Sequence, residues 1–107
     1  MSAGYVRACA LSLLQEDVPK KVELNGVPVA IVRTDEGVFA INDICSHANV
    51  SLSEGEVEDC MIECWLHGSS FDLRTGKPSG LPATRPVAVY PVKIEGDDVL
   101  VSVNQEN

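Results

Sequence analysis

The chain is poor in histidine, in aromatic residues and in long apolar segments. Only two histidines occur in its 107 residues, and aromatic residues make up 5% of the total. No apolar run approaches the roughly 20 residues that cross a bilayer, and no charged segment followed by a long apolar stretch opens the chain, so we expect a soluble, unexported protein of the cytoplasm. Domains usually contain about 50 to 250 residues, so we expect a single domain over residues 1–107, with no room for a separate catalytic domain.

Basic residues are scarce as well. Sixteen acidic residues oppose eight basic ones, which gives a formal net charge of −8. This excess argues against nucleic acid and against an anionic membrane as partners. It favours a protein partner with a basic docking patch, although acidic residues that only maintain solubility would produce the same composition. We expect a monomer whose acidic side chains gather in residues 54–59 and 95–98 and at Glu63.

The pattern of apolar residues predicts an all-β protein with antiparallel strands. No segment has a sustained 3.6-residue period, and turn residues separate short β-prone segments at close intervals. Asn25-Gly26 predicts a type I′ hairpin turn, because that turn requires positive φ at both central residues. Leu11–Asp17 predicts a single helical turn with Ser12 as its cap. The predicted strands are Tyr5–Ala10, Lys20–Leu24, Val27–Arg33, Val38–Asn42, Met61–Cys64, Val87–Ile94 and Val99–Val103.

Both histidines follow cysteines at short range. The two motifs are Cys45-Ser46-His47 and Cys64-Trp65-Leu66-His67, with sixteen residues between them. A Rieske [2Fe–2S] centre needs this ligand set, because two cysteines hold one iron and two histidines hold the other. The use of both histidines of the chain in two such pairs argues against coincidence.

The similarity to Rieske ferredoxins continues beyond these motifs, over roughly residues 42–89. It includes the segments Gly68-Ser69-Ser70-Phe71-Asp72, Arg74-Thr75-Gly76 and Gly80-Leu81-Pro82-Ala83. The resemblance implies an antiparallel β-sandwich or barrel-like base with a loop-rich cluster-binding subdomain at about residues 43–84. It also implies one [2Fe–2S] cluster, whose inner iron binds Cys45 and Cys64 and whose outer iron binds His47 and His67.

Departures from the pattern of high-potential Rieske proteins predict a low reduction potential. Those members have a disulfide across the two cluster loops, where this chain has Val50 and Leu66, and a tyrosine hydroxyl directed at a ligand sulfur, where it has Phe71. Ser69 matches the family's serine donor to a bridging sulfide. Hydrogen bonds to cluster sulfurs stabilise the reduced state, so losing one lowers the potential towards the bottom of the Rieske range of roughly −150 to +300 mV.

Other residues near the motifs have predicted structural roles. Gly68 lets the backbone approach the cluster and offer an N–H to sulfur. Pro82 helps to hold the segment Gly80-Leu81-Pro82-Ala83, which resembles the family's cover loop, over the cluster. Trp65 either shields the cluster and shapes the docking face or simply fills space. Cys9 and Cys60, the cysteines without histidine partners, are interpreted as small buried hydrophobic residues.

The sequence therefore predicts a one-electron carrier that passes electrons from a flavoprotein reductase to a non-haem iron oxygenase or a similar acceptor. It is not expected to be an enzyme, because the catalytic iron of Rieske oxygenases needs further histidines that this chain lacks. A redox carrier or sensor for iron–sulfur cluster assembly is one alternative, and a structural Cys₂His₂ zinc domain is another. The presence of the ligands argues against the cluster-free small subunit of nitrite reductases, which shares the fold.

Overall fold

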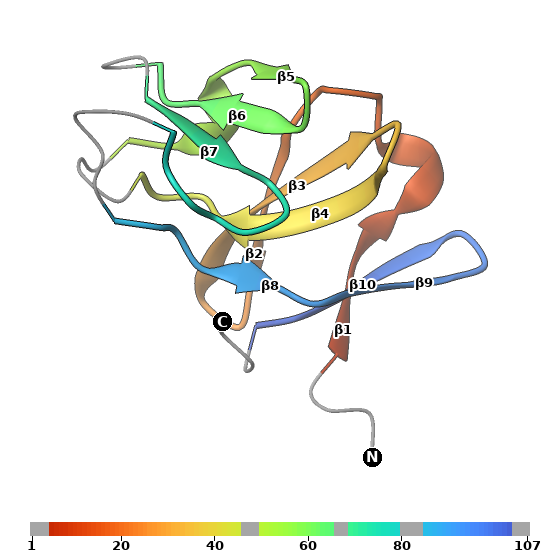
Figure 1. Cartoon of the computed structure of the whole chain (residues 1–107). Coiled ribbons are helices and arrows are strands. Elements are labelled where there is room, and N and C mark those ends of the chain that lie inside the picture. The colour runs from red at the N-terminus through yellow and green to blue at the C-terminus, as the bar shows by residue number, and fades with distance from the viewer. Residues whose placement is uncertain (1–4, 46–49, 66–68, 80–84, 104–107) are drawn as a thin grey trace.

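The computed structural model describes residues 5–45, 50–65, 69–79 and 85–103, which form three antiparallel sheets. The strand orders are β1–β10–β9, β2–β3–β4–β8 and β5–β6–β7, and Figure 1 shows the third sheet above the second and the first sheet below it. This confirms the predicted all-β class. The elements are β1 (Tyr5–Ala10), η1 (Leu11–Leu13), β2 (Lys20–Leu24), β3 (Val27–Thr34), β4 (Gly37–Asn42), η2 (Leu52–Glu54), β5 (Val57–Glu58), β6 (Met61–Glu63), β7 (Ser70–Asp72), β8 (Val89–Tyr90), β9 (Val92–Glu95) and β10 (Asp98–Ser102).

The central strand β3 contributes to two hydrophobic cores. Val29 and Ile31 belong to the core that the second sheet shares with β10, whereas Ala30 and Val32 belong to the core beneath the third sheet. Successive side chains of a strand point to opposite faces, so a strand covered on both faces supplies alternate residues to each side. The second sheet is therefore the middle layer, and its upper face supports the third sheet.

The hairpin predicted at Asn25-Gly26 is present. The φ angles of these residues are 52° and 80°, and Leu24 pairs with Val27 across the turn. Positive φ at both positions is the requirement from which the turn was predicted.

The predicted strand Val87–Ile94 is wrong in its extent. The structure divides this segment at Pro91 into β8, which pairs with β4, and β9, which pairs with β10. Proline has no N–H to donate to a ladder, so it ends one pairing before the next begins. The chain passes at this residue from the second sheet to the first.

The sequence did not predict β5 and β7, which contain two and three residues. Both pair with β6, and such short strands depend on that pairing more than on their own propensity. The predicted cap at Ser12 is wrong, because η1 begins after Ala10 without a side-chain cap. Ser12 instead donates its N–H and its hydroxyl to the Asp97 carboxylate, each at 3.0 Å. In the described ranges, no helix has the length and apolar character that a bilayer crossing requires.

Candidate metal centre

Cys45 and Cys64 occupy equivalent positions at the start of two loops. The Cys45 N–H donates to the Val50 carbonyl at 3.0 Å, and the Cys64 N–H donates to the Ser69 carbonyl at 2.6 Å. Each bond joins a cysteine to the residue five positions later. The same backbone bond thus closes both loops at their base, and each loop contains one of the predicted histidines.

Both thiols are buried in one apolar environment. Cys45 is 3% exposed and Cys64 is fully buried, and both belong to the core that also contains Leu52, Ile62 and Phe71. Neither is in a disulfide, as is also true of Cys9 and Cys60. The structure therefore brings two soft sulfur donors from separate loops to one apolar core, which fits the cysteine half of a [2Fe–2S] site.

The predicted ligands His47 and His67 lie outside the described residues, as do Leu66, Gly68 and Pro82. Among the residues that the structure does describe, no group of three or more histidine, cysteine, aspartate or glutamate side chains could hold a metal ion. The predicted ligand set is divided between described and undescribed segments, so its completion by the histidines stays a prediction.

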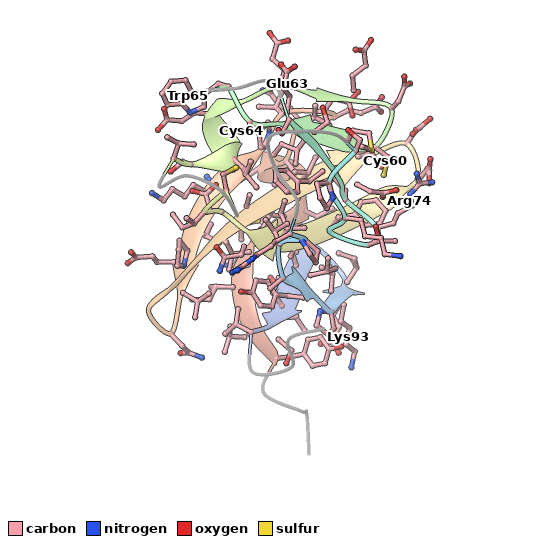
Figure 2. The ribbon with its side chains drawn as sticks, turned by 60° about the vertical axis from the view of Figure 1, so that its left-hand side comes forward. Cys60, Glu63, Cys64, Trp65, Arg74 and Lys93 are labelled. Carbon is pink, nitrogen blue, oxygen red and sulfur yellow. The ribbon has the colours of Figure 1, made fainter. Side chains whose placement is uncertain are left out.

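The structure separates the residues expected around the cysteines into buried and exposed ones. Ser69 is 2% exposed and Phe71, on β7, is fully buried, so both lie on the inner side of the second loop. Trp65 is 50% exposed, and Figure 2 shows it at the outer surface beside Cys64. Half exposure favours the contribution of Trp65 to an exposed face over the space-filling alternative, and its role stays a prediction.

Cys9 and Cys60 are buried, as their interpretation as small hydrophobic residues requires. Cys9 belongs to the core that the second sheet shares with β10. Cys60 lies at the β5–β6 turn, and burial raises the pKa of both thiols above the ordinary cysteine value. Raised pKa values favour the neutral thiol, which is a poor nucleophile.

Sequence reasoning assigned no role to Asp43, the residue two positions before Cys45. Its side chain is fully buried, and its Oδ1 accepts a hydrogen bond from the Ser53 N–H at 2.8 Å. Its Oδ2 lies 3.8 Å from the Nζ of Lys21 and accepts no hydrogen bond from the described residues. The sequence signal for a structural role of Asp43 was its position directly after an apolar strand. Only the fold shows that its carboxylate points inwards.

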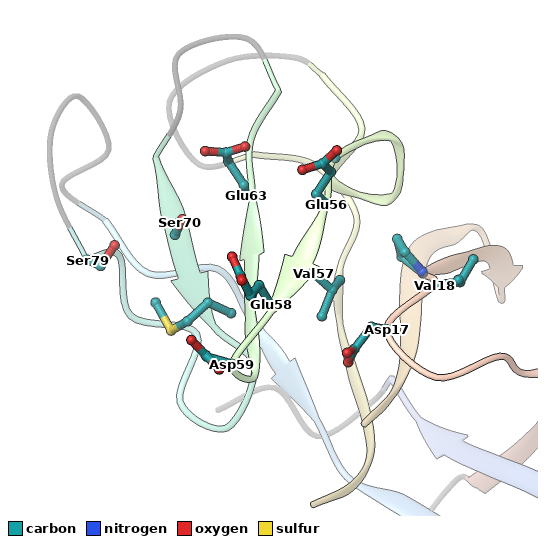
Figure 3. Close-up of a pocket in the computed structure, with 12 residues that line it drawn as sticks. Asp17, Val18, Glu56, Val57, Glu58, Asp59, Glu63, Ser70 and Ser79 are labelled. Atoms are coloured by element: carbon teal, nitrogen blue, oxygen red, sulfur yellow. The ribbon is translucent and has the colours of Figure 1, made fainter. Parts of the chain in front are cut away.

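An acidic groove of about 940 Å³ lies beside the second loop. It separates the third sheet from the segment around Asp17 and Val18, as Figure 3 shows. Its carboxylates come from Asp17, Glu56, Glu58, Asp59 and Glu63. Glu63 directly precedes Cys64, so negative charge extends to the edge of the candidate centre.

Comparison with known families identifies the class of protein. Residues 4–91 match the family described as the Rieske [2Fe-2S] domain, and the chain belongs to that family. It therefore carries one [2Fe–2S] cluster, which decides against the zinc domain. The two buried cysteines of the structure suit this assignment.

Relatives of this chain within the family are ferredoxins. It is 43% identical over 94 residues to the anthranilate 1,2-dioxygenase ferredoxin subunit of Burkholderia cepacia, covering 88% of this chain and 87% of that protein. It is 40% identical over 99 residues to the 3-phenylpropionate/cinnamic acid dioxygenase ferredoxin subunit of Escherichia coli strain K12, covering 92% of each.

Solved structures lead to the same class. The ferredoxin of carbazole 1,9a-dioxygenase from Nocardioides aromaticivorans IC177 matches with a TM-score of 0.88 and 39% identity, over 92% of this chain and 96% of that one. A chain from the complex of reduced oxygenase and oxidised ferredoxin in carbazole 1,9a-dioxygenase matches with a TM-score of 0.90 and 32% identity. The match covers 99% of this chain and 98% of that one. The protein is a Rieske ferredoxin, an electron carrier and not itself a catalyst.

Proposed function

We propose that this ferredoxin accepts one electron from a flavoprotein reductase and passes it to the terminal oxygenase of a dioxygenase system. The structural observation that carries the proposal is the pair of buried thiols, Cys45 and Cys64, at the bases of two equally closed loops that each contain a histidine. The dioxygenase systems named for its relatives, and the oxygenase–ferredoxin complex of carbazole 1,9a-dioxygenase, support an oxygenase as the acceptor.

In this proposal the chain supplies four ligands. Cys45 and Cys64 hold the inner iron from the apolar core, and His47 and His67 hold the outer iron. The cluster stores one electron, and neutral imidazoles keep the charge of the site small. A [2Fe–2S]²⁺ core with two thiolates has a net charge of zero when oxidised, and reduction by one electron changes it to −1.

The surroundings of the cysteines favour a low potential. Phe71 is fully buried in the same core and cannot donate a hydrogen bond, and Val50 packs against that core where a disulfide cysteine would otherwise lie. With fewer groups to stabilise the added negative charge, the reduced state is less favoured. A low-potential carrier suits donation to an oxygenase better than oxidation of a quinol.

The remaining parts of the proposal concern the localisation, oligomeric state and domain organisation of the protein. We place it in the cytoplasm, where reducing conditions keep its cysteines available as ligands. We expect a monomer with one domain over residues 1–107, in which residues 43–84 form the cluster-binding part. The third sheet and the two closed loops lie in that segment, which supports this division.

Potentiometric EPR titration of the purified protein tests the ligand set and the potential together. We expect a Rieske signal after reduction, at a potential low in the family range, and its loss in Cys45→Ser and His47→Ala. Cys9→Ser is the matched control, because Cys9 lies in the other core, and it should keep the full signal. A colourless, zinc-loaded protein without a signal after dithionite, or equal loss in all three variants, would contradict the proposal.

A reconstituted assay tests the partners. A flavoprotein reductase and a terminal oxygenase of a dioxygenase system should turn over substrate only when this ferredoxin is added. His47→Ala should give no turnover. Turnover of an aromatic substrate by the ferredoxin alone, or no electron transfer from any such reductase, would contradict the assignment.

A further inference from the structure

Gly55 lies where the chain leaves the first cysteine loop and passes against the second. A Cβ atom at this position would overlap the carbonyl oxygen of Glu63 and lie 2.9 Å from its carbonyl carbon and 3.3 Å from the Leu52 oxygen. The backbone of Gly55 has φ of −91° and ψ of −170°, which any residue adopts. Glycine is required here for space and not for conformation.

The group that would be displaced belongs to the peptide that carries Cys64. The Glu63 carbonyl and the Cys64 N–H are in one peptide plane, because the peptide bond between them is rigid. That N–H donates to Ser69, and the Glu63 N–H donates to the Glu56 carbonyl at 2.8 Å. The peptide is therefore held through its own N–H, and the preceding peptide is held through the Glu63 N–H, so pressure on the Glu63 oxygen tilts the plane and moves the Cα of Cys64.

Backbone contacts also join Gly55 to the first cysteine loop. Its N–H donates to the Leu52 carbonyl at 2.9 Å, and the Leu52 N–H donates to the Asp43 carbonyl at 2.6 Å. The buried carboxylate of Asp43 accepts from the Ser53 N–H as well. The short helix η2 is thus fixed to the segment that leads into Cys45.

We propose that Gly55 is a positioning residue for the two cluster cysteines. The contacts from Asp43 through η2 and Gly55 to Glu63 form a brace that sets how closely Cys45 and Cys64 approach each other. The proposal rests on the ligand set given under the proposed function. Even a small change in sulfur placement alters the electronic structure of an iron bound by both sulfurs, so the brace should affect spectroscopic properties as well as stability.

The experiment compares two glycine variants in the holoprotein by EPR, potentiometry and iron and sulfide analysis. Gly55→Ala should shift the g values and the midpoint potential and should release the cluster faster than the unsubstituted protein. Gly96→Ala is the matched control, because Gly96 has a φ of 61° with no atom within 4 Å of an added Cβ. It should lower the thermal stability and leave both the g values and the potential unchanged.

A second pair of variants tests the other end of the brace, including the case in which Gly55→Ala does not fold. Asp43→Asn and Asp43→Ala both remove the charge, but only asparagine keeps an oxygen that accepts from the Ser53 N–H. The alanine variant should therefore shift the g values more than the asparagine variant. This difference isolates the hydrogen bond from the charge.

The outcomes separate this inference from the proposed function. If Gly55→Ala keeps a full cluster with unchanged g values and potential, the inference is overturned although the ligand set stands. Equal g-value shifts in the two Asp43 variants also overturn it. If the unsubstituted protein has no Rieske signal, the proposed ligand set itself fails.

Discussion

At the scale of single residues, Phe71 offers a direct test of how the potential is determined. Phe71→Tyr adds one hydroxyl to a side chain that is fully buried in the core of the two cysteines. A hydrogen bond to a charged acceptor is worth about 1.5 to 3 kcal/mol, and about 59 mV corresponds to a tenfold change for one electron. These values convert to an increase in potential of up to roughly 65 to 130 mV, measured by EPR titration.

Phe39 provides the control for this substitution. It lies on β4 and packs against the same core while being only partly buried. Phe39→Tyr should leave the potential unchanged. An unchanged or lowered potential in folded Phe71→Tyr would contradict the account of the low potential.

Trp65 allows a test of partner docking at the same scale. It is a large apolar side chain, half exposed and adjacent to Cys64, and such residues often dominate the energy of an interface. Trp65→Ala should slow electron transfer to the partner by about tenfold, without changing the potential. Leu13→Ala is the control, because Leu13 is 65% exposed on η1. Equal rates in the two variants, measured by stopped-flow absorbance, would argue against a docking role for Trp65.

At the scale of secondary-structure elements, the β5–β6 turn stores conformational strain. Asp59 and Cys60 have φ angles of 54° and 62°, a region that disfavours residues with a Cβ atom. Asp59→Gly relieves about 1 to 2 kcal/mol of strain and adds about 0.4 to 1 kcal/mol of unfolded-chain entropy, so it should raise the free energy of unfolding by about 0.5 to 1 kcal/mol, measured by urea denaturation. Asp35→Gly, in the β3–β4 turn at a residue without positive φ, should instead lower it, because glycine adds entropy to the unfolded chain. Destabilisation by both substitutions would contradict this account.

Elements also show where prediction from the sequence succeeded. The hairpin at Asn25-Gly26 is determined by the φ requirements of two adjacent residues, so local chemistry was sufficient. β5 and β7 are too short to carry such a signal and form through pairing with β6. Pro91 was visible in the sequence. That the residues before it pair with β4 and the residues after it pair with β10 became evident only in the fold.

At the scale of the whole molecule, the net charge of −8 predicts electrostatic steering towards a basic partner. The rate of electron transfer should fall as ionic strength rises, because the Debye length is about 10 Å at 0.1 M salt. Glu58→Gln, in the groove beside the second loop, should lower the association rate more than Glu95→Gln. Glu95 pairs at 3.0 Å with Lys93, which lies at the opposite end of the molecule from Cys64 in Figure 2.

The measurement is stopped-flow electron transfer at several salt concentrations. Equal losses of rate in the two variants would show that only total charge matters. Rates that do not depend on salt would contradict steering altogether.

The order of residues alone was sufficient to predict the chemistry of this protein. Two Cys/His motifs predict the cluster type, since a ligand's identity is a property of its own side chain and its near neighbours. The missing tyrosine and disulfide cysteines predict the potential class for the same reason. The family assignment confirms the cluster, and the four individual ligands stay a prediction.

How the two cysteine loops are held together became evident only in the folded chain. The burial of Cys45 and Cys64 in one core, the inward carboxylate of Asp43 and the lack of space at Gly55 all depend on backbone segments that are distant in sequence. A sequence pattern records what each residue prefers locally. Which carbonyl faces Gly55 depends on how closely the residue after η2 approaches the end of β6, and therefore appears only when the chain is folded.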